Sequence, residues 1–250
     1  MQTNFQKVRD FNISFGIERS KTPSDKLFKL RWDLIQEESN ELFDAIKQKD
    51  HIEIIDALSD ILYVIHGAAD SFEQDLDLFF NESTIQNFIN LNNLSIDNLK
   101  NLKGVARMEA VFEQSPDMLN KIINNSYAYE LFKLHEFFEQ KNITEIIKQL
   151  VILLNYVYLI ADLFGVDLNQ SFNLVHESNM SKLAETEEIA QQTVEWYLKN
   201  ETRYDSPSYR LSTIQINNQP RWVIFNKNSG KALKSIHYKP VELKEFLNNF

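Results

Sequence analysis

Six carboxylates in two short stretches are the side chains of this sequence best suited to chemistry. They are Glu37, Glu38 and Glu41, followed by Glu53, Asp56 and Asp60. At helical spacing each trio gathers on one part of its helix, where like charges at i,i+4 are destabilising. No lysine or arginine stands between Asp33 and Asp44 to relieve that repulsion. Because a hard cation needs several oxygens and negative charge, the pattern predicts a site for Mg²⁺, with Mn²⁺ as an alternative.

An ordinary solvated acidic face is the competing interpretation of these carboxylates. They adjoin an apolar stripe, however, instead of lying opposite to it. The stripe comprises Leu34, Leu42 and Ile46, then Ile54, Leu58, Ile61, Leu62 and Ile65. This spacing predicts two helices joined by a tight turn at Gln48–Asp50. Two antiparallel neighbours would present both acidic faces to one another, which favours the metal site.

The two acidic motifs resemble those of a known superfamily. EExxE on one helix, followed by DxxxD on the next, is similar to the all-α nucleoside triphosphate pyrophosphohydrolases, which include MazG, dimeric dUTPase and phosphoribosyl-ATP pyrophosphohydrolase. The resemblance implies a mainly helical fold and Mg²⁺-dependent cleavage between the α- and β-phosphates. It also implies the roles of the acidic residues, with Glu38, Glu41, Asp56 and Asp60 as metal ligands and Glu37 as the residue that orients or deprotonates water.

One position departs from the usual pattern of that superfamily. Its second motif is normally ExxD, but Ala57 stands at the glutamate position and Asp56 comes one residue earlier. The sequence leaves open whether Asp56 or Glu53 completes the metal shell.

The amino-acid composition limits the classes of function that this chain could have. The 250 residues are 43% apolar and include few glycines and prolines, which favours a globular, helix-rich protein. The absence of cysteine excludes disulfides, thiolate metal sites and a cysteine nucleophile. A net charge of −10 disfavours binding to nucleic acid polymers. No signal peptide is evident, and Leu150–Phe164 is too short for a membrane span, so we expect a cytoplasmic protein without a membrane partner.

The second half of the chain repeats the first. Glu41–Asn81 aligns with Lys133–Asn173, with identities at Leu42/Leu134, Gln48/Gln140, Glu53/Glu145, Ile54/Ile146, Leu58/Leu150, Leu62/Leu154, Ala69/Ala161, Phe72/Phe164 and Asp75/Asp167. The acidic positions differ, because Glu37, Glu41, Asp56 and Asp60 become Tyr129, Lys133, Lys148 and Ile152. The pattern predicts a duplicated hairpin in which only the first copy binds metal.

The predicted fold is therefore mainly α, with two hairpins forming a four-helix-bundle core and a small antiparallel β-meander at the C-terminus. We place an all-α domain at residues 1–200, containing the active hairpin 24–80 and the degenerate repeat 127–173. The β tail occupies 201–250, where RLSTIQI, PRWVIF and KALKSI read as three strands. Residues 82–125 read as short helices interrupted at Gly104 and Ser115-Pro116.

Further residues are candidates for nucleotide binding. Phe15 suits core packing, yet the resemblance also implies that its segment approaches the base. Arg31 could pair with the carboxylates or reach a phosphate. The SNMSK segment resembles the superfamily helix that holds the triphosphate, which implies roles for Asn179 and Lys182. The GKALKSIHY tail resembles a tail of the same branch, and its Lys231 and Lys234 offer positive charge that a triphosphate needs, with Tyr238 as a contact for the sugar or base. We expect the tail to close over the nucleotide, against the alternative of a surface hairpin with ordinary lysines.

These observations lead to three functional hypotheses. The first is a nucleoside triphosphate pyrophosphohydrolase, with dUTP, dCTP or a damaged nucleotide among its substrates. The second is phosphoribosyl-ATP hydrolysis, disfavoured because that enzyme is usually shorter and unduplicated. The third is a helical binding protein that has lost turnover. No phosphate-binding glycine loop or nucleophile motif supports another chemistry, and homodimerisation is left open.

Overall fold

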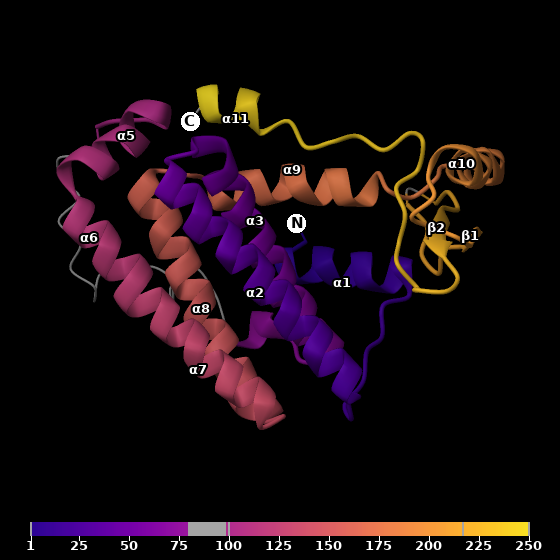
Figure 1. The fold of residues 1–250 in the computed structure, drawn as a ribbon, viewed down its shortest axis with the longest axis horizontal. Helices are drawn as coiled ribbons and strands as arrows, with labels where there is room; N and C mark the ends of the chain where they lie inside the picture. Colours follow the sequence, from indigo (N-terminus) through magenta and orange to yellow (C-terminus); the bar gives the residue numbers. More distant parts are fainter. Residues whose placement is uncertain (1, 80–98, 100, 217, 250) are drawn as a thin grey trace. The chain divides into compact units, whose positions relative to one another are not determined.

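The computed structural model describes all residues except 1, 80–98, 100, 217 and 250 (Figure 1). It divides the chain into two compact units. Unit 1 comprises residues 1–5, 19–173 and 242–250, and unit 2 comprises residues 6–18 and 174–241. These boundaries differ from a division near residue 200, because the SNMSK segment belongs to unit 2 and each end of the chain contributes residues to both units.

The first hairpin of unit 1 consists of α2 (Asp25–Gln48) and α3 (His51–Ser71). Ser24 caps α2 by accepting a hydrogen bond from the Leu27 amide, and Asp50 caps α3 by accepting from the amides of Ile52 and Glu53. The predicted hairpin and its turn are confirmed.

The second hairpin consists of α7 (Ala128–Glu139) and α8 (Ile143–Phe164). Its backbone repeats that of the first at matching positions. Lys49 and Lys141 end α2 and α7 with left-handed φ values of 56° and 53°. Glu73 and Gly165, which follow α3 and α8, have φ values of 56° and 78°. The same unusual conformations recur where the sequences align, which supports the inferred duplication.

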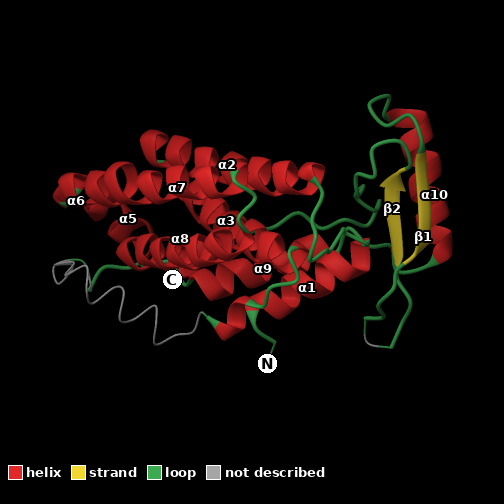
Figure 2. Ribbon diagram, turned by 90° about the horizontal axis from the view of Figure 1, so that it is seen from below, coloured by secondary structure: helices red, strands yellow, loops and turns green. Residues whose placement is uncertain are grey.

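The two hairpins pack into a four-helix core, with α3 against α8 and α2 against α7 (Figures 1 and 2). Leu58, Leu62, Leu150 and Leu154, all identical between the repeats, are completely buried. Helix α8 is long and apolar enough to cross a membrane by composition, but 67% of its most apolar window is buried inside the protein. That burial fits the predicted core helix.

Short helices connect the hairpins. A 3₁₀ turn, η1 (Leu76–Leu78), follows α3; α5 (Gly104–Gln114) and α6 (Pro116–Asn120) lead into the π-helix η2 (Lys121–Tyr127). The predicted break at Ser115-Pro116 is confirmed, because Ser115 separates α5 from α6. Helix α5 begins at Gly104, and most of the 82–125 segment before it lies outside the described residues. From α5, Arg107 donates to the carbonyls of Leu163 and Asp162 and so caps the end of α8.

In unit 2, β1 (Pro207–Leu211) and β2 (Trp222–Asn226) form an antiparallel pair from Pro207↔Asn226 to Leu211↔Trp222. The strands pack on α10 (Glu187–Asn200), as Figure 2 shows. Helices α1 (Asn4–Phe15) and α9 (Leu168–Met180) each pass from one unit into the other along the chain.

The small antiparallel sheet is confirmed, but the prediction of three strands is wrong. Within KALKSI only Ala232 bridges to Phe225. The Leu233 amide still donates to the Ile224 carbonyl, but the next two amides leave the ladder, because Lys234 donates to the Tyr197 hydroxyl and Ser235 to the Lys182 carbonyl. The side chains and helix ends of unit 2 therefore take the hydrogen bonds that a third strand would have made.

The β segment also secures the end of α1. Arg210, Ser212 and Thr213 donate to the carbonyls of Phe15, Ser14 and Ile13, respectively. Gly16 follows with φ +63°, and a Cβ there would lie 2.5 Å from Arg210 Nη2. Glycine is favoured at this turn, because its φ is left-handed and a larger residue would displace the Arg210 side chain.

The last helix, α11 (Leu243–Asn249), corrects the prediction of a purely β tail. It packs on α3 and α5, and Leu243, Phe246 and Leu247 are buried. Removing the whole tail would therefore strip part of the unit 1 core, so such a deletion cannot test lid closure alone.

We expect Phe246→Ala to destabilise the protein by about 3 kcal/mol, because it removes a buried ring. Denaturant unfolding would measure this, with Lys244→Ala on the exposed side of α11 as the matched control. Equal stability of the two variants would show that α11 is not part of the core.

Candidate functional site

The α2–α3 hairpin places the predicted carboxylates at the junction of core and solvent. Glu38, Asp56 and Asp60 are half-buried, while Glu37 and Glu41 are exposed. The apolar seam between the two helices, including Ile35, Leu42 and Ile54, holds these carboxylates in place.

Glu38 lies at the centre of this carboxylate cluster. Burial, followed by the negative charges of Asp60, Glu41 and Glu37, raises its pKa to about 8. The protonated Glu38 carboxyl also donates a hydrogen bond to the Glu41 carboxylate. Since Asp60 belongs to α3 and the others to α2, the interaction crosses the hairpin.

Asp56 provides a second link between the helices. Burial, followed by the charges of Glu53 and Glu41, raises its pKa to about 6. Asp56 is half-buried within the cluster and near Glu41, whereas Glu53 is exposed. This placement favours Asp56 over Glu53 as the fourth ligand, the alternative that the sequence left open.

Among the residues that the structure describes, no three or more histidine, aspartate or glutamate side chains are gathered as a formed metal site. The donor chemistry nevertheless fits a divalent cation. Glu38, Glu41, Asp56 and Asp60 supply hard oxygen ligands from two facing helices, and their mutual repulsion is the kind that a bound cation relieves.

Arg31 lies near a different carboxylate from those of the two acidic motifs with which a pairing was considered. It is 5% exposed, and its nearby opposite charge is Asp70, near the end of α3. Burial, the larger effect, lowers the Arg31 pKa to about 10 despite that partner. Asp70 also accepts a hydrogen bond from Arg19 Nε at 3.0 Å. Asp70 was not singled out from the sequence as a partner of Arg31, because a pairing across α2 and α3 leaves no local pattern.

The second hairpin carries neutralised charges at the positions of the acidic cluster. Lys133 pairs with Glu130 at 3.0 Å, and Lys148 pairs with Glu145 at 2.7 Å. Gln149 donates a further hydrogen bond of 2.7 Å to Glu130. The retained glutamates of the repeat are thus satisfied by the protein itself.

In unit 2, the structure brings four of the predicted nucleotide-binding residues into two pairs. Lys182 donates to Asn179 Oδ1 at 2.5 Å. The Lys234 ammonium lies 4.3 Å from the ring centre of Tyr238. Lys231 is exposed beside the turn at Gly230 and is not part of either pair.

Two serines connect these pairs, and sequence reasoning missed them. Ser178 Oγ lies 3.1 Å from the Tyr238 hydroxyl and 2.9 Å from the Lys239 carbonyl oxygen. The Lys239 amide donates to Ser181 Oγ at 2.9 Å. The SNMSK motif itself contained the signal, because its serines alternate with the residues that were singled out.

Phe15 takes the structural role considered for it. It is 6% exposed and packs with Leu183 and Val223 in a core cluster of unit 2. Its ring centre lies 4.3 Å from that of Phe11. A contact between Phe15 and a base stays a prediction.

Comparison with known proteins identifies the family. The phosphoribosyl-ATP pyrophosphohydrolase family model matches residues 8–86, the part of the chain that contains all six carboxylates. The chain belongs to the all-α nucleoside triphosphate pyrophosphohydrolase superfamily.

A full-length relative extends this result beyond the first hairpin. Uncharacterized protein L479 of Acanthamoeba polyphaga mimivirus is 34% identical over 258 residues, which cover 98% of this chain and 96% of that protein. No solved structure matches the chain at a significant level. The similarity to the viral protein therefore includes the second hairpin, which lies outside the match to the family model, and unit 2, most of which lies outside it.

The pKa shifts of this superfamily member predict a pH-dependent stability. Glu38 favours its protonated form in the folded state, so metal-free protein should lose stability as pH rises from about 6.5 to about 8. The buried His66 and His176 have pKa values lowered to about 3 and 4. They make stability increase with pH, but only below about pH 6.5.

Thermal unfolding in chelator would measure this effect, and Glu38→Gln should flatten the slope between pH 6.5 and 8. Parallel slopes for the wild type and Glu38→Gln would contradict the assigned environment of Glu38.

The neutralised second hairpin predicts one nucleotide site per chain. Calorimetric titration with a non-hydrolysable nucleotide analogue and Mg²⁺ should give a stoichiometry near one. Two equivalent sites per chain would show that the repeat still binds substrate.

Proposed function

We propose that this protein is a Mg²⁺-dependent pyrophosphohydrolase that cleaves a nucleoside triphosphate between its α- and β-phosphates. The products would be a nucleoside monophosphate and pyrophosphate. The observation that carries the proposal is the carboxylate cluster across α2 and α3, in which Glu38 is hydrogen-bonded to Glu41 and lies close to Asp60. Membership of the superfamily supports the same reaction class.

In this proposal Glu38, Glu41, Asp56 and Asp60 would hold the metal. Bound there, Mg²⁺ would polarise a phosphoryl oxygen and lower the pKa of a coordinated water. With a cation present, all four side chains would act as carboxylates, because a ligating carboxyl group must be deprotonated. Mn²⁺ offers similar ligand chemistry and is an alternative.

Glu37 is the proposed general base. It is exposed, adjoins the ligand Glu38 and adds to the negative potential there. A carboxylate beside the ligand set, and outside it, can accept the proton of an attacking water or orient that water. Its separation from the apolar seam leaves the side chain free to adjust to a substrate.

The nucleotide contacts of unit 2 stay proposals. The Lys182 ammonium donates to the Asn179 side-chain oxygen, and the Lys234 ammonium lies over the Tyr238 ring. Ammonium groups in such surroundings are suited to phosphate oxygens. Asn179 and Tyr238 would accompany them, Lys231 is a further candidate at the Gly230 turn, and Arg31 is weakened as a candidate by its burial.

Phosphoribosyl-ATP is the second candidate substrate, favoured by the description of the matched family model. The duplicated hairpin and unit 2 distinguish this chain from the short enzymes of that type. Pyrophosphate release from a panel of ribonucleoside and deoxyribonucleoside triphosphates and phosphoribosyl-ATP, each with Mg²⁺, tests both candidates. Turnover of none would support a binding protein without catalytic activity.

We expect Asp60→Asn to reduce turnover by at least about 100-fold, because loss of even an outer-shell partner costs about 10–100-fold. Thermal stability without metal should be unchanged or higher, since one repelling charge is removed. The matched control is Asp44→Asn, which removes an exposed charge from α2. Normal turnover of Asp60→Asn would refute the metal assignment.

A further inference from the structure

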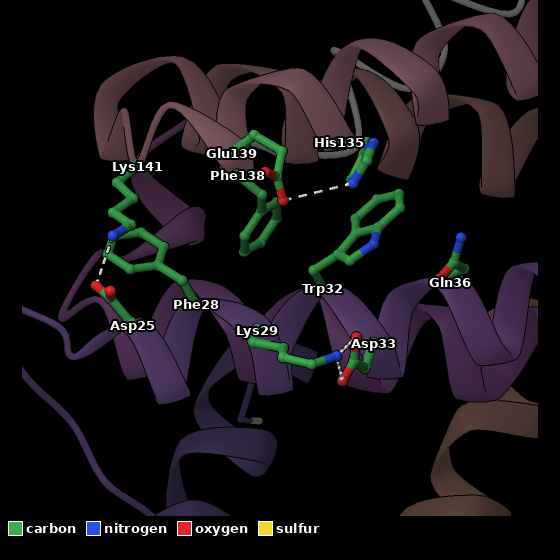
Figure 3. Close-up of a pocket in the computed structure, with 10 residues that line it drawn as sticks. All are labelled: Asp25, Phe28, Lys29, Trp32, Asp33, Gln36, His135, Phe138, Glu139 and Lys141. Atoms are coloured by element: carbon green, nitrogen blue, oxygen red, sulfur yellow. Dashed lines mark hydrogen bonds and ion pairs between the residues drawn. The ribbon is translucent and has the colours of Figure 1, made fainter.

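A cavity of about 390 Å³ opens between α2 and α7 in unit 1 (Figure 3). Its volume falls within the range of about 300–1,000 Å³ typical of small-molecule sites. It is lined by Asp25, Phe28, Lys29, Trp32, Asp33, Gln36, His135, Phe138, Glu139 and Lys141. None of the six carboxylates of the proposed hydrolytic site is among these residues.

The cavity has an aromatic wall. The rings of Trp32 and His135 are in contact, with centres 4.5 Å apart and planes tilted by 30°. Phe138 stands 6.0 Å from Trp32, and buried Phe28 stands 6.4 Å from Phe138. Figure 3 shows these rings turned toward one another from the two helices. Such a wall is suited to a flat ring.

Polar groups at one end of the cavity are available to a ligand. The Trp32 indole and the Gln36 amide make no side-chain hydrogen bond to any residue in the described part of the chain. They lie one helical turn apart on α2, on the side that faces α7 (Figure 3). Together they offer donors and an acceptor beside the aromatic wall, which matches the edge of a nitrogen heterocycle.

The charged side chains that line the cavity disfavour a polyanionic ligand. Lys141 pairs with Asp25 at 2.6 Å, and Lys29 pairs with Asp33 at 2.7 Å. Glu139 lies 3.7 Å from His135. Both lysines of the lining already have a carboxylate partner, and the lining has one more carboxylate than it has lysines, which disfavours binding of a phosphate.

We propose that this cavity is an accessory site for a nucleobase or nucleoside, without phosphate, bound against Trp32 and hydrogen-bonded to Gln36. The site is separate from the proposed hydrolytic site, whose carboxylates repel one another across α2 and α3. It does not depend on turnover, since neither metal nor phosphate takes part in recognition.

Calorimetric titration of the full chain with adenosine, guanosine, cytidine and thymidine in chelator tests the proposal. At least one nucleoside should bind with a Kd below about 1 mM. Trp32→Ala should weaken that binding by roughly tenfold or more, because base–aromatic stacking is lost. Gln36→Leu changes an exposed side chain of similar size and should weaken binding with no loss of folding. Trp196→Ala, at an exposed tryptophan in unit 2, is the matched control and should bind normally.

Two comparisons separate this site from the proposed hydrolytic site. Asp60→Asn should bind the nucleoside as tightly as the wild type, and the corresponding monophosphate should bind more weakly than the nucleoside. The proposal is overturned if no nucleoside binds, if Gln36→Leu and Trp32→Ala bind normally, if Asp60→Asn loses binding, or if the monophosphate binds more tightly.

Discussion

Electrostatic repulsion between half-buried carboxylates on α2 and α3 is the constraint on which the rest of the structure depends. Glu38 and Asp56 are both harder to ionise than free carboxyl groups, because burial and neighbouring negative charges act together. A hairpin with such a cluster needs stabilisation from elsewhere. The completely buried seam of Ile35, Leu42 and Leu58 provides it, and the second hairpin covers the opposite face of α3.

The duplication shows what the same scaffold does without that constraint. In α7 and α8 two of the equivalent positions carry lysines, Lys133 and Lys148, and each retained glutamate has a cation within 3.0 Å. The buried leucines and the left-handed turn residues are nevertheless preserved. The packing was thus retained while the charges changed. This difference indicates that the acidic cluster of the first hairpin serves a purpose other than folding.

Local sequence patterns were sufficient to predict most of the fold. The apolar periodicity, the turn at Gln48–Asp50 and the internal repeat were sufficient to predict the hairpins and their bundle. The acidic cluster followed from the same spacing, because residues on one helical face must lie together. Its coupling across two helices was also predictable once the turn between them was placed.

Features that depend on distant partners were not predictable. KALKSI has strand-like composition, but its Lys234 and Ser235 amides donate to Tyr197 and Lys182. Neither acceptor could be assigned from the KALKSI sequence alone. Arg31 faces Asp70 across the hairpin, and Trp32 meets His135 from the other repeat. These contacts depend on how the helices rotate against one another, which periodicity specifies only coarsely.

Locating a bound cation would test the central claim most directly. Crystals of the full chain grown with Mn²⁺ should show anomalous scattering between α2 and α3, with Glu38, Glu41, Asp56 and Asp60 as ligands. The second hairpin should show none. A cation bound elsewhere, or an empty α2–α3 cluster at saturating Mn²⁺, would contradict the account.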